Sequence, residues 1–176
     1  MRAALFTEVG RPLDVVDDID IQGPVFGQVR VRIAACGVCH SDLSLVQGHI
    51  PLPGPTIPGH EAAGEVIELG AGVDSLAVGD HVVLSPNPAC GRCEYCRSGH
   101  ENLCPDARFT GYHRDGGYAD HTIAKADYAF EIHGDYSDVE AAPLLCAGLI
   151  GHRCLRMAGE ARRLGIARVL LRKAPI

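Results

Sequence analysis

The sequence predicts a mainly β domain over residues 1–136, followed by a helical segment over residues 137–166. Short apolar runs rich in valine and isoleucine recur through the first part. Glycine and proline bound these runs, which is typical of a compact all-β barrel or sandwich. The character changes near Ser137, where Ser137-Asp138-Val139-Glu140 matches the capping box of a helix N-terminus.

Four apolar runs are the clearest expected strands, and they lie at residues 29–35, 64–69, 81–84 and 121–124. Turn residues separate them: Gly23-Pro24, Gly70-Ala71-Gly72, Gly79-Asp80 and Gly116-Gly117. We expect helix over residues 138–163, with a break near Pro143 and Cys146. Periodicity alone does not distinguish one β fold from another.

Composition excludes several classes of function. A net charge of −6 argues against general nucleic-acid binding, which needs a basic surface. No run approaches the roughly 20 apolar residues of a membrane span, and the N-terminus lacks the apolar stretch of a secretory signal. We therefore expect a cytoplasmic chain with neither a nucleic acid nor a membrane as partner. In that compartment, clustered cysteines hold metal more often than they form disulfides.

Four cysteines cluster in a lobe at about residues 86–106: Cys90, Cys93, Cys96 and Cys104. Four thiolates fill every position of a tetrahedral zinc and leave none for water or substrate, so such a site is structural. The surrounding loop has too little apolar content to fold unaided, and metal binding would supply that energy. A zinc-ribbon binding module is the alternative, although ribbons carry two cysteine pairs separated by a longer span.

A second candidate group is dispersed through the chain and consists of Cys39, His60 and Cys146. Two thiolates and one imidazole leave a fourth zinc position open for water or an alcohol oxygen, as catalytic sites require. Taken singly, Cys146 also suits a core position, and His60 also suits a hydrogen-bonded loop. Only a fold can bring the three side chains together.

The motifs around these residues resemble those of the zinc-dependent medium-chain alcohol dehydrogenases. Gly59-His60-Glu61-x2-Gly64-x5-Gly70-x2-Val73 is similar to the zinc signature of that family. Gly37-Val38-Cys39-His40-Ser41-Asp42 resembles its first-ligand motif, and Ala142-Pro143-Leu144-Leu145-Cys146-Ala147-Gly148 resembles its third. The resemblance covers residues 1–166 and implies a GroES-like barrel catalytic domain with a structural-zinc lobe.

The resemblance implies two zinc ions per chain, one catalytic on the dispersed group and one structural in the lobe. It implies an enzyme that oxidises a small alcohol to an aldehyde or ketone, with hydride transfer to NAD or NADP. Zinc lowers the pKa of the bound alcohol in such a reaction. By the same resemblance, Ser41 takes the alcohol proton, and Asp42 orients the His60 ring. Glu61 modulates the coordination from behind the zinc.

His40 matches a family position that contacts the pyrophosphate of the cofactor. One departure concerns Ser44, which stands where many members carry a proton-relay histidine. Serine cannot act as a base near neutral pH, so we expect proton release through water or another group. Cys36 and Cys154 match no ligand position, and we interpret both as structural thiols.

In the family, a Rossmann domain follows the third zinc ligand and opens with a strand that runs into a glycine-rich turn. Residues 163–166 resemble the start of that strand, but residues 167–176 read as an unmatched basic tail. No G-x-G-x-x-G occurs in the chain. We therefore expect a truncated alcohol dehydrogenase that is inactive alone and exposes apolar surface.

The alternatives are a non-enzymatic zinc-binding module and one half of a split dehydrogenase. A homo-oligomer or a separate cofactor-domain chain would then be the partner.

Overall fold

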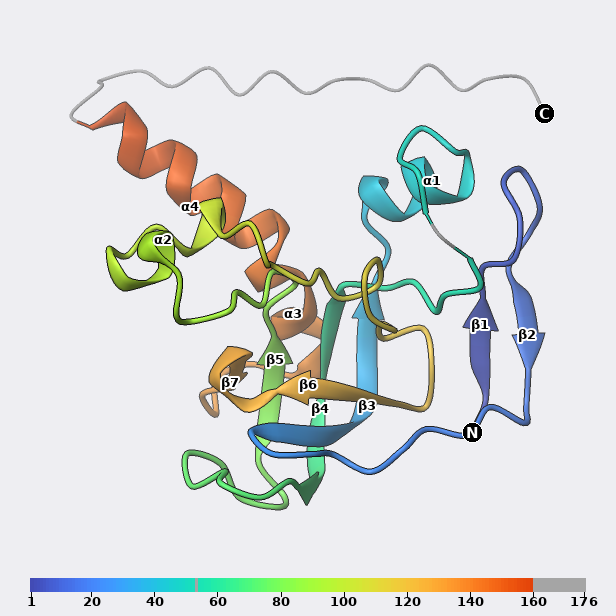
Figure 1. Ribbon diagram of the computed structural model, residues 1–176, viewed down its shortest axis with the longest axis horizontal. Coiled ribbons are helices and arrows are strands. Elements are labelled where there is room, and N and C mark those ends of the chain that lie inside the picture. Colours follow the sequence, from blue (N-terminus) through green and yellow to red (C-terminus); the bar gives the residue numbers. More distant parts are fainter. Residues whose placement is uncertain (53, 160–176) are drawn as a thin grey trace.

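The computed structural model describes residues 1–52 and 54–159. Within these ranges the chain forms one five-stranded sheet, one two-stranded sheet and several short helices (Figure 1). The end of the expected helix, the strand start expected at 163–166 and the basic tail at 167–176 lie outside the described residues.

The main sheet is antiparallel, with its strands in the order β6-β3-β4-β5-β7. In that order the strands are β6 (His121–Lys125), β3 (Gln28–Gly37), β4 (Glu61–Leu69), β5 (His81–Leu84) and β7 (Ala129–Glu131). The four predicted apolar runs all lie in this sheet, so they are confirmed as strands. A small separate sheet pairs β1 (Ala3–Leu5) with β2 (Asp14–Val16).

The two edge strands of the main sheet, β6 and β7, are consecutive in the chain. Only the short 3-10 helix η2 (Ala126–Tyr128) joins them. Because β6 pairs with β3 and β7 pairs with β5, this connection draws the two edges together and curls the sheet. In Figure 1, β6 accordingly crosses in front of β4 and β5. The predicted mainly β, barrel-type fold is therefore confirmed.

The core lies inside the curl of the sheet. Its most deeply buried side chains are aliphatic and come from three neighbouring strands: Val29, Val31, Val66, Val82 and Leu84. Full burial of each such side chain stabilises the fold by roughly 1.5–3 kcal/mol. Gly64 of β4 faces the backbone of β3, where a Cβ would collide with the carbonyl of Arg32, so the central strand pair requires glycine at this position.

Short helices follow the sheet strands at the end where the candidate ligands lie. The helix α1 (His40–Val46) comes directly after β3. The predicted capping box is confirmed, because Ser137 Oγ accepts from the Glu140 N–H at 3.4 Å and Glu140 Oε2 accepts from the Ser137 N–H at 3.0 Å. The predicted break is also confirmed. The helical segment divides into α3 (Asp138–Ala141), η3 (Ala142–Leu145) and α4 (Ala147–Ala158).

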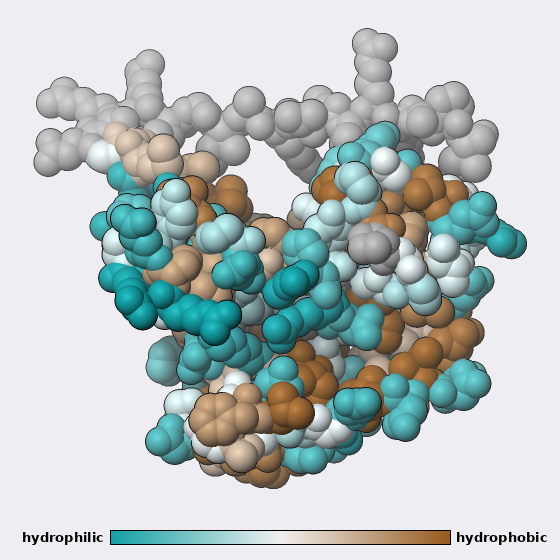
Figure 2. Space-filling view, viewed as in Figure 1, coloured by the Kyte–Doolittle hydropathy of each residue, from teal (hydrophilic) through white to brown (hydrophobic). Residues whose placement is uncertain are grey.

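The helix α4 projects from the sheet with none of its residues buried (Figure 1). Four large apolar side chains on it are at least half exposed: Leu149, Ile150, Leu155 and Met157. Figure 2 shows polar side chains over much of this face of the molecule, interrupted by apolar patches. No helix in the described part of the chain is long and apolar enough to cross a membrane.

Candidate metal centres

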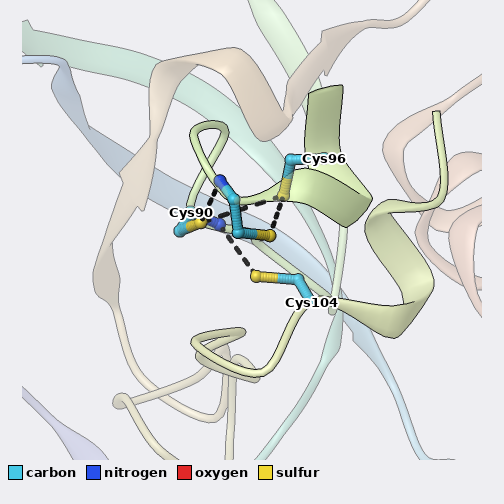
Figure 3. A group of neighbouring side chains, drawn as sticks. Cys90, Cys96 and Cys104 are labelled. Atoms are coloured by element: carbon cyan, nitrogen blue, oxygen red, sulfur yellow. Dashed lines mark hydrogen bonds between the residues drawn. The ribbon is translucent and has the colours of Figure 1, made fainter. Parts of the chain in front are cut away.

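The four-cysteine lobe contains the short helices α2 (Glu94–Arg97) and η1 (Glu101–Leu103). Its four sulfur atoms all lie within 4.8 Å of one another, and Figure 3 shows the side chains of Cys90, Cys96 and Cys104 converging. Cys96 Sγ is 3.9 Å from Cys90 Sγ and 3.4 Å from Cys93 Sγ. Two thiolates on one tetrahedral zinc, each bonded at about 2.3 Å, lie about 3.8 Å apart. The donor set and its spacing therefore fit zinc.

Backbone N–H groups favour the thiolate form of one of these cysteines, which is the form that binds metal. The N–H groups of Arg92 and Cys93 donate to Cys90 Sγ at 3.5 and 3.4 Å, and they lower the pKa of that thiol to about 6. Burial, followed by a hydrogen bond with Cys93, raises the pKa of Cys96 to about 12. Metal ligands must be thiolates, so Cys96 has to give up a proton on binding.

The dispersed group converges at one end of the sheet, although its two cysteines are 107 positions apart. Cys39 Sγ lies 3.9 Å from Cys146 Sγ, and Cys146 Sγ lies 3.4 Å from His60 Nε2. Tetrahedral zinc predicts about 3.8 Å between two sulfurs and about 3.6 Å between sulfur and imidazole nitrogen. The geometry of this second group therefore fits zinc as well.

Neighbouring elements position these three side chains. Cys39 follows β3 and forms the N-cap of α1, while His60 immediately precedes β4, which is the antiparallel partner of β3. Cys146 lies at the junction between η3 and α4, and η3 packs on β3, β4 and β5. Gly59, just before His60, has a φ of +95°, a conformation that favours glycine.

Asp42 holds the His60 ring from the side opposite Cys146. Its Oδ1 lies 3.1 Å from His60 Nδ1, and its Oδ2 accepts the N–H of Cys39 at 2.9 Å. The hydrogen bond with Asp42 raises the pKa of His60 to about 9. Burial opposes ionisation of Asp42, but the hydrogen bond and charge of His60 outweigh it and lower the pKa of the carboxyl. With Nδ1 occupied, Nε2 is the nitrogen that can bind a metal.

The two cysteines of the dispersed group have different electrostatic environments. Burial raises the pKa of Cys39, but hydrogen bonds from the backbone and hydroxyl of Ser41 outweigh it, so the net shift is downward. Cys39 Sγ lies 3.7 Å from Ser41 Oγ. Burial and the charge of Cys39 raise the pKa of Cys146 to about 12. Cys39 is therefore the first thiolate of the pair.

Glu61 lies beside Cys39, His60 and Cys146 and is buried, with 6% of its surface exposed. A carboxylate oxygen of Glu61 lies within 4.8 Å of the donor atoms of Cys39, His60 and Cys146. Gly37 makes room for this carboxylate, because a Cβ at that position would collide with Oε2.

The remaining predicted residues lie around this group. His40 is exposed at the start of α1, and its Nδ1 is 3.4 Å from Ser44 Oγ. Cys36 is half-buried, and burial raises the pKa of its thiol to about 12, while Cys154 is exposed on α4. In the part of the chain that the structure describes, neither of these two cysteines belongs to a cluster of side chains that could bind a metal ion.

A cavity of about 310 Å³ opens onto the dispersed group. Ser41 and His60 line it, together with a mainly apolar wall: Leu45, Ile50, Pro86, Phe109, Thr110, Gly111 and Tyr112. The sequence motifs did not indicate this wall. The available signal was Phe109-Thr110-Gly111-Tyr112, two aromatic residues in a tight glycine turn just before Gly116-Gly117.

Residues 26–134 match the family model described as the alcohol dehydrogenase GroES-like domain. The chain is 43% identical over 164 residues to an alcohol dehydrogenase of Geobacillus stearothermophilus, covering 90% of this chain and 48% of that protein. It is 38% identical over 168 residues to an NAD-dependent alcohol dehydrogenase of Sulfurisphaera tokodaii, with coverage of 90% and 48%.

Solved structures give the same result. The alcohol dehydrogenase of Aeropyrum pernix superposes with a TM-score of 0.83 at 35% identity, covering 90% of this chain and 48% of that one. A cobalt- and zinc-bound thermostable alcohol dehydrogenase of Pyrobaculum aerophilum gives a TM-score of 0.84 at 32% identity, with coverage of 90% and 49%. The chain thus spans about half the length of the relatives it matches.

Proposed function

Because the chain belongs to the alcohol dehydrogenase GroES-like domain family, we propose that it supplies the zinc- and alcohol-binding half of a nicotinamide-dependent alcohol dehydrogenase. The observation that carries this proposal is the contrast between the two ligand groups. The lobe offers four thiols, none of which lines the cavity of about 310 Å³, whereas the dispersed group combines two thiols with His60 and the Glu61 carboxylate, and His60 lines that cavity. An open position beside a cavity is what a catalytic zinc requires.

The proposed structural zinc binds Cys90, Cys93, Cys96 and Cys104, and the catalytic zinc binds Cys39, His60 and Cys146. Bound there, the catalytic ion supplies a Lewis acid for the oxygen of an alcohol or carbonyl. Asp42 keeps the proton of His60 on Nδ1 and leaves Nε2 free. The buried carboxylate of Glu61 adds negative charge behind the ligands.

Ser41 is the proposed acceptor of the alcohol proton, because its side chain lines the cavity together with His60. Ser44 cannot receive that proton as a base at neutral pH. Its hydroxyl lies 3.4 Å from His40 Nδ1, and the proposed route of proton release is through water or another group. His40, at the start of the same helix, is the proposed contact for the cofactor pyrophosphate, whether NAD or NADP.

We propose that the 176-residue chain does not turn over alone. The sequence holds no G-x-G-x-x-G, and the strand pairs of residues 1–52 and 54–159 are antiparallel, whereas dinucleotide-binding folds are built on parallel sheets. A second half that binds the nicotinamide cofactor, in the same or a separate polypeptide, then completes the enzyme. A second candidate function is a zinc-binding docking module, which the exposed apolar side chains of α4 favour.

The proposed compartment is the cytoplasm. All eight cysteines lie in the described ranges as free thiols, and six of them belong to the two metal groups. Reduced thiols of this kind persist where glutathione and thioredoxin keep them available for metal.

Two measurements test the proposal. Elemental analysis of the zinc-loaded chain should give two zinc ions, with one lost in Cys146→Ser and none lost in the matched control Cys154→Ser. Hydride transfer is then assayed by NADH absorbance, after fusion of the chain to the cofactor-binding half of the Geobacillus stearothermophilus relative. We expect turnover of a primary or secondary alcohol by the fusion and none by the chain alone. Two bound zinc ions with no turnover by a folded fusion would reject the enzymatic proposal and favour the docking module.

A further inference from the structure

We propose that His113 is a positioning residue that holds Phe109 and Tyr112 as an aromatic wall of the cavity. This wall favours alcohols with an aromatic or branched apolar group over ethanol. The inference rests on the proposed function, because it concerns the same cavity and names the class of substrate that the cavity accepts.

His113 lies against the rings of both wall residues. Its ring centroid is 5.3 Å from that of Phe109, with an interplanar angle of 24°, and 4.3 Å from that of Tyr112, with an angle of 64°. One contact is stacked and the other is edge-on, and both are favourable arrangements of aromatic rings. His113 itself is exposed, so these ring contacts rather than burial hold it in place.

Backbone hydrogen bonds fix the same three residues. The N–H of Phe109 donates to His113 Nδ1 at 3.1 Å, so the imidazole carries its proton on Nε2. The carbonyl of Phe109 accepts the N–H of His113 at 2.8 Å and the N–H of Tyr112 at 3.3 Å. The histidine therefore bonds through both its ring and its backbone to the first residue of the wall.

The loop that carries the wall is attached to the segment that precedes His60. Gly116 N–H donates to the carbonyl of Ile57, and Gly117 N–H donates to that of Gly59, each at 2.7 Å. Gly111 has a φ of +73°, and a Cβ there would lie 2.9 Å from the backbone nitrogen of Gly59. The wall and the candidate ligand His60 thus share one rigid backbone frame.

The shape of the cavity indicates its occupant. Ser41 and His60 line it and would meet a hydroxyl, and Phe109 and Tyr112 add aromatic rings to the same lining. Ethanol would fill only part of a cavity of about 310 Å³. Benzyl alcohol adds a ring that can pack on aromatic lining, and a cavity of this volume holds a molecule of that size.

The test measures binding, because the chain alone is not expected to turn over. The zinc-loaded, ¹⁵N-labelled chain is titrated with benzyl alcohol and with ethanol, and the amide shifts of Thr110 and Gly111 are followed. We expect wild type to bind benzyl alcohol at least about 10-fold more tightly than ethanol. His113→Ala should reduce that preference about 3- to 10-fold, because the wall loses its aromatic support.

Two further variants separate positioning from general folding. His113→Phe keeps a ring against Phe109 and Tyr112 but removes the acceptor of the Phe109 N–H, so it should retain more of the preference than His113→Ala does. His133→Ala removes an exposed histidine outside the cavity and should change neither affinity. If His113→Ala does not fold, Tyr112→Leu replaces it, because that change removes a ring of the wall while keeping apolar bulk. It too should lower the preference.

An unchanged preference in His113→Ala, with zinc content and the amide spectrum preserved, overturns the inference, as does a preference in His113→Phe no greater than that in His113→Ala. Equal binding of the two alcohols by wild type also overturns it, while leaving the proposed function in place. A chain that holds two zinc ions but binds neither alcohol overturns both.

Discussion

Replacing Asp42 by asparagine should weaken zinc binding at the dispersed group without affecting the lobe. Both carboxylate oxygens accept a hydrogen bond, Oδ1 from His60 Nδ1 at 3.1 Å and Oδ2 from the Cys39 N–H at 2.9 Å. Asparagine has the same shape but only one acceptor oxygen, so one of these two donors loses its partner. Loss of a group that orients a metal-binding histidine costs about 10- to 100-fold in metal affinity, or about 1.4–2.7 kcal/mol.

The assay is competition between the chain and a chromophoric zinc chelator at pH 7, combined with elemental analysis. The matched control is Asp138→Asn. Asp138 makes the same kind of contact to His81 Nδ1, at 3.0 Å, and neither residue belongs to a ligand group. We expect the control to bind both zinc ions as wild type does. A second zinc bound by Asp42→Asn as tightly as by wild type would refute the argument that this carboxylate orients His60.

Three further predictions concern the pH dependence of zinc binding, the zinc content of a lobe variant and the stability cost of a side chain at Gly37. The pKa of His60 is raised from 6.5 to about 9, so its ion pair with Asp42 stabilises the metal-free fold fully below pH 6.5 and loses that effect as the pH rises through 9. Zinc needs the neutral ring, so affinity at the dispersed group should rise over the same interval, as isothermal titration at several pH values would record. Cys93→Ser should leave one zinc per chain by elemental analysis, because the two groups share no ligand. Gly37→Ala should lower stability by about 1–3 kcal/mol in chemical denaturation, because its Cβ meets the buried carboxylate of Glu61.

The strands that can be predicted from the sequence are those whose own residues form an apolar run bounded by turn residues. Runs such as residues 81–84 are apolar, bounded by turn residues and buried in the core. The strands β1, β2 and β7 are only three residues long, and none of them has more than one buried residue. Such strands exist because a neighbouring strand offers hydrogen bonds, and that partner is not visible in the local sequence. The capping box is the opposite case, since Ser137 and Glu140 lie three positions apart and satisfy each other.

The same distinction separates the parts of the site. The four-cysteine spacing indicates a metal site without any knowledge of the fold. Bringing Cys39 to Cys146 across 107 positions requires the sheet, so resemblance rather than spacing identified that group. The aromatic wall at Phe109 and Tyr112 was missed because an aromatic pair in a loop is more often simple packing. Its role depends on the attachment of that loop beside His60, which only the three-dimensional structure reveals.

The two metal groups therefore depend on the fold in different ways. The lobe closes a loop of only 14 positions between Cys90 and Cys104, so ordering its ligands costs little conformational entropy. The dispersed group spans β3, β4 and the junction before α4, and its ligands meet only when the barrel has formed. A metal that binds the folded state alone stabilises that state by mass action. Zinc at the dispersed group should therefore raise the stability of the whole barrel, whereas zinc in the lobe should stabilise mainly the lobe. Zinc at the dispersed group is thus the ion whose binding reports that the barrel has folded.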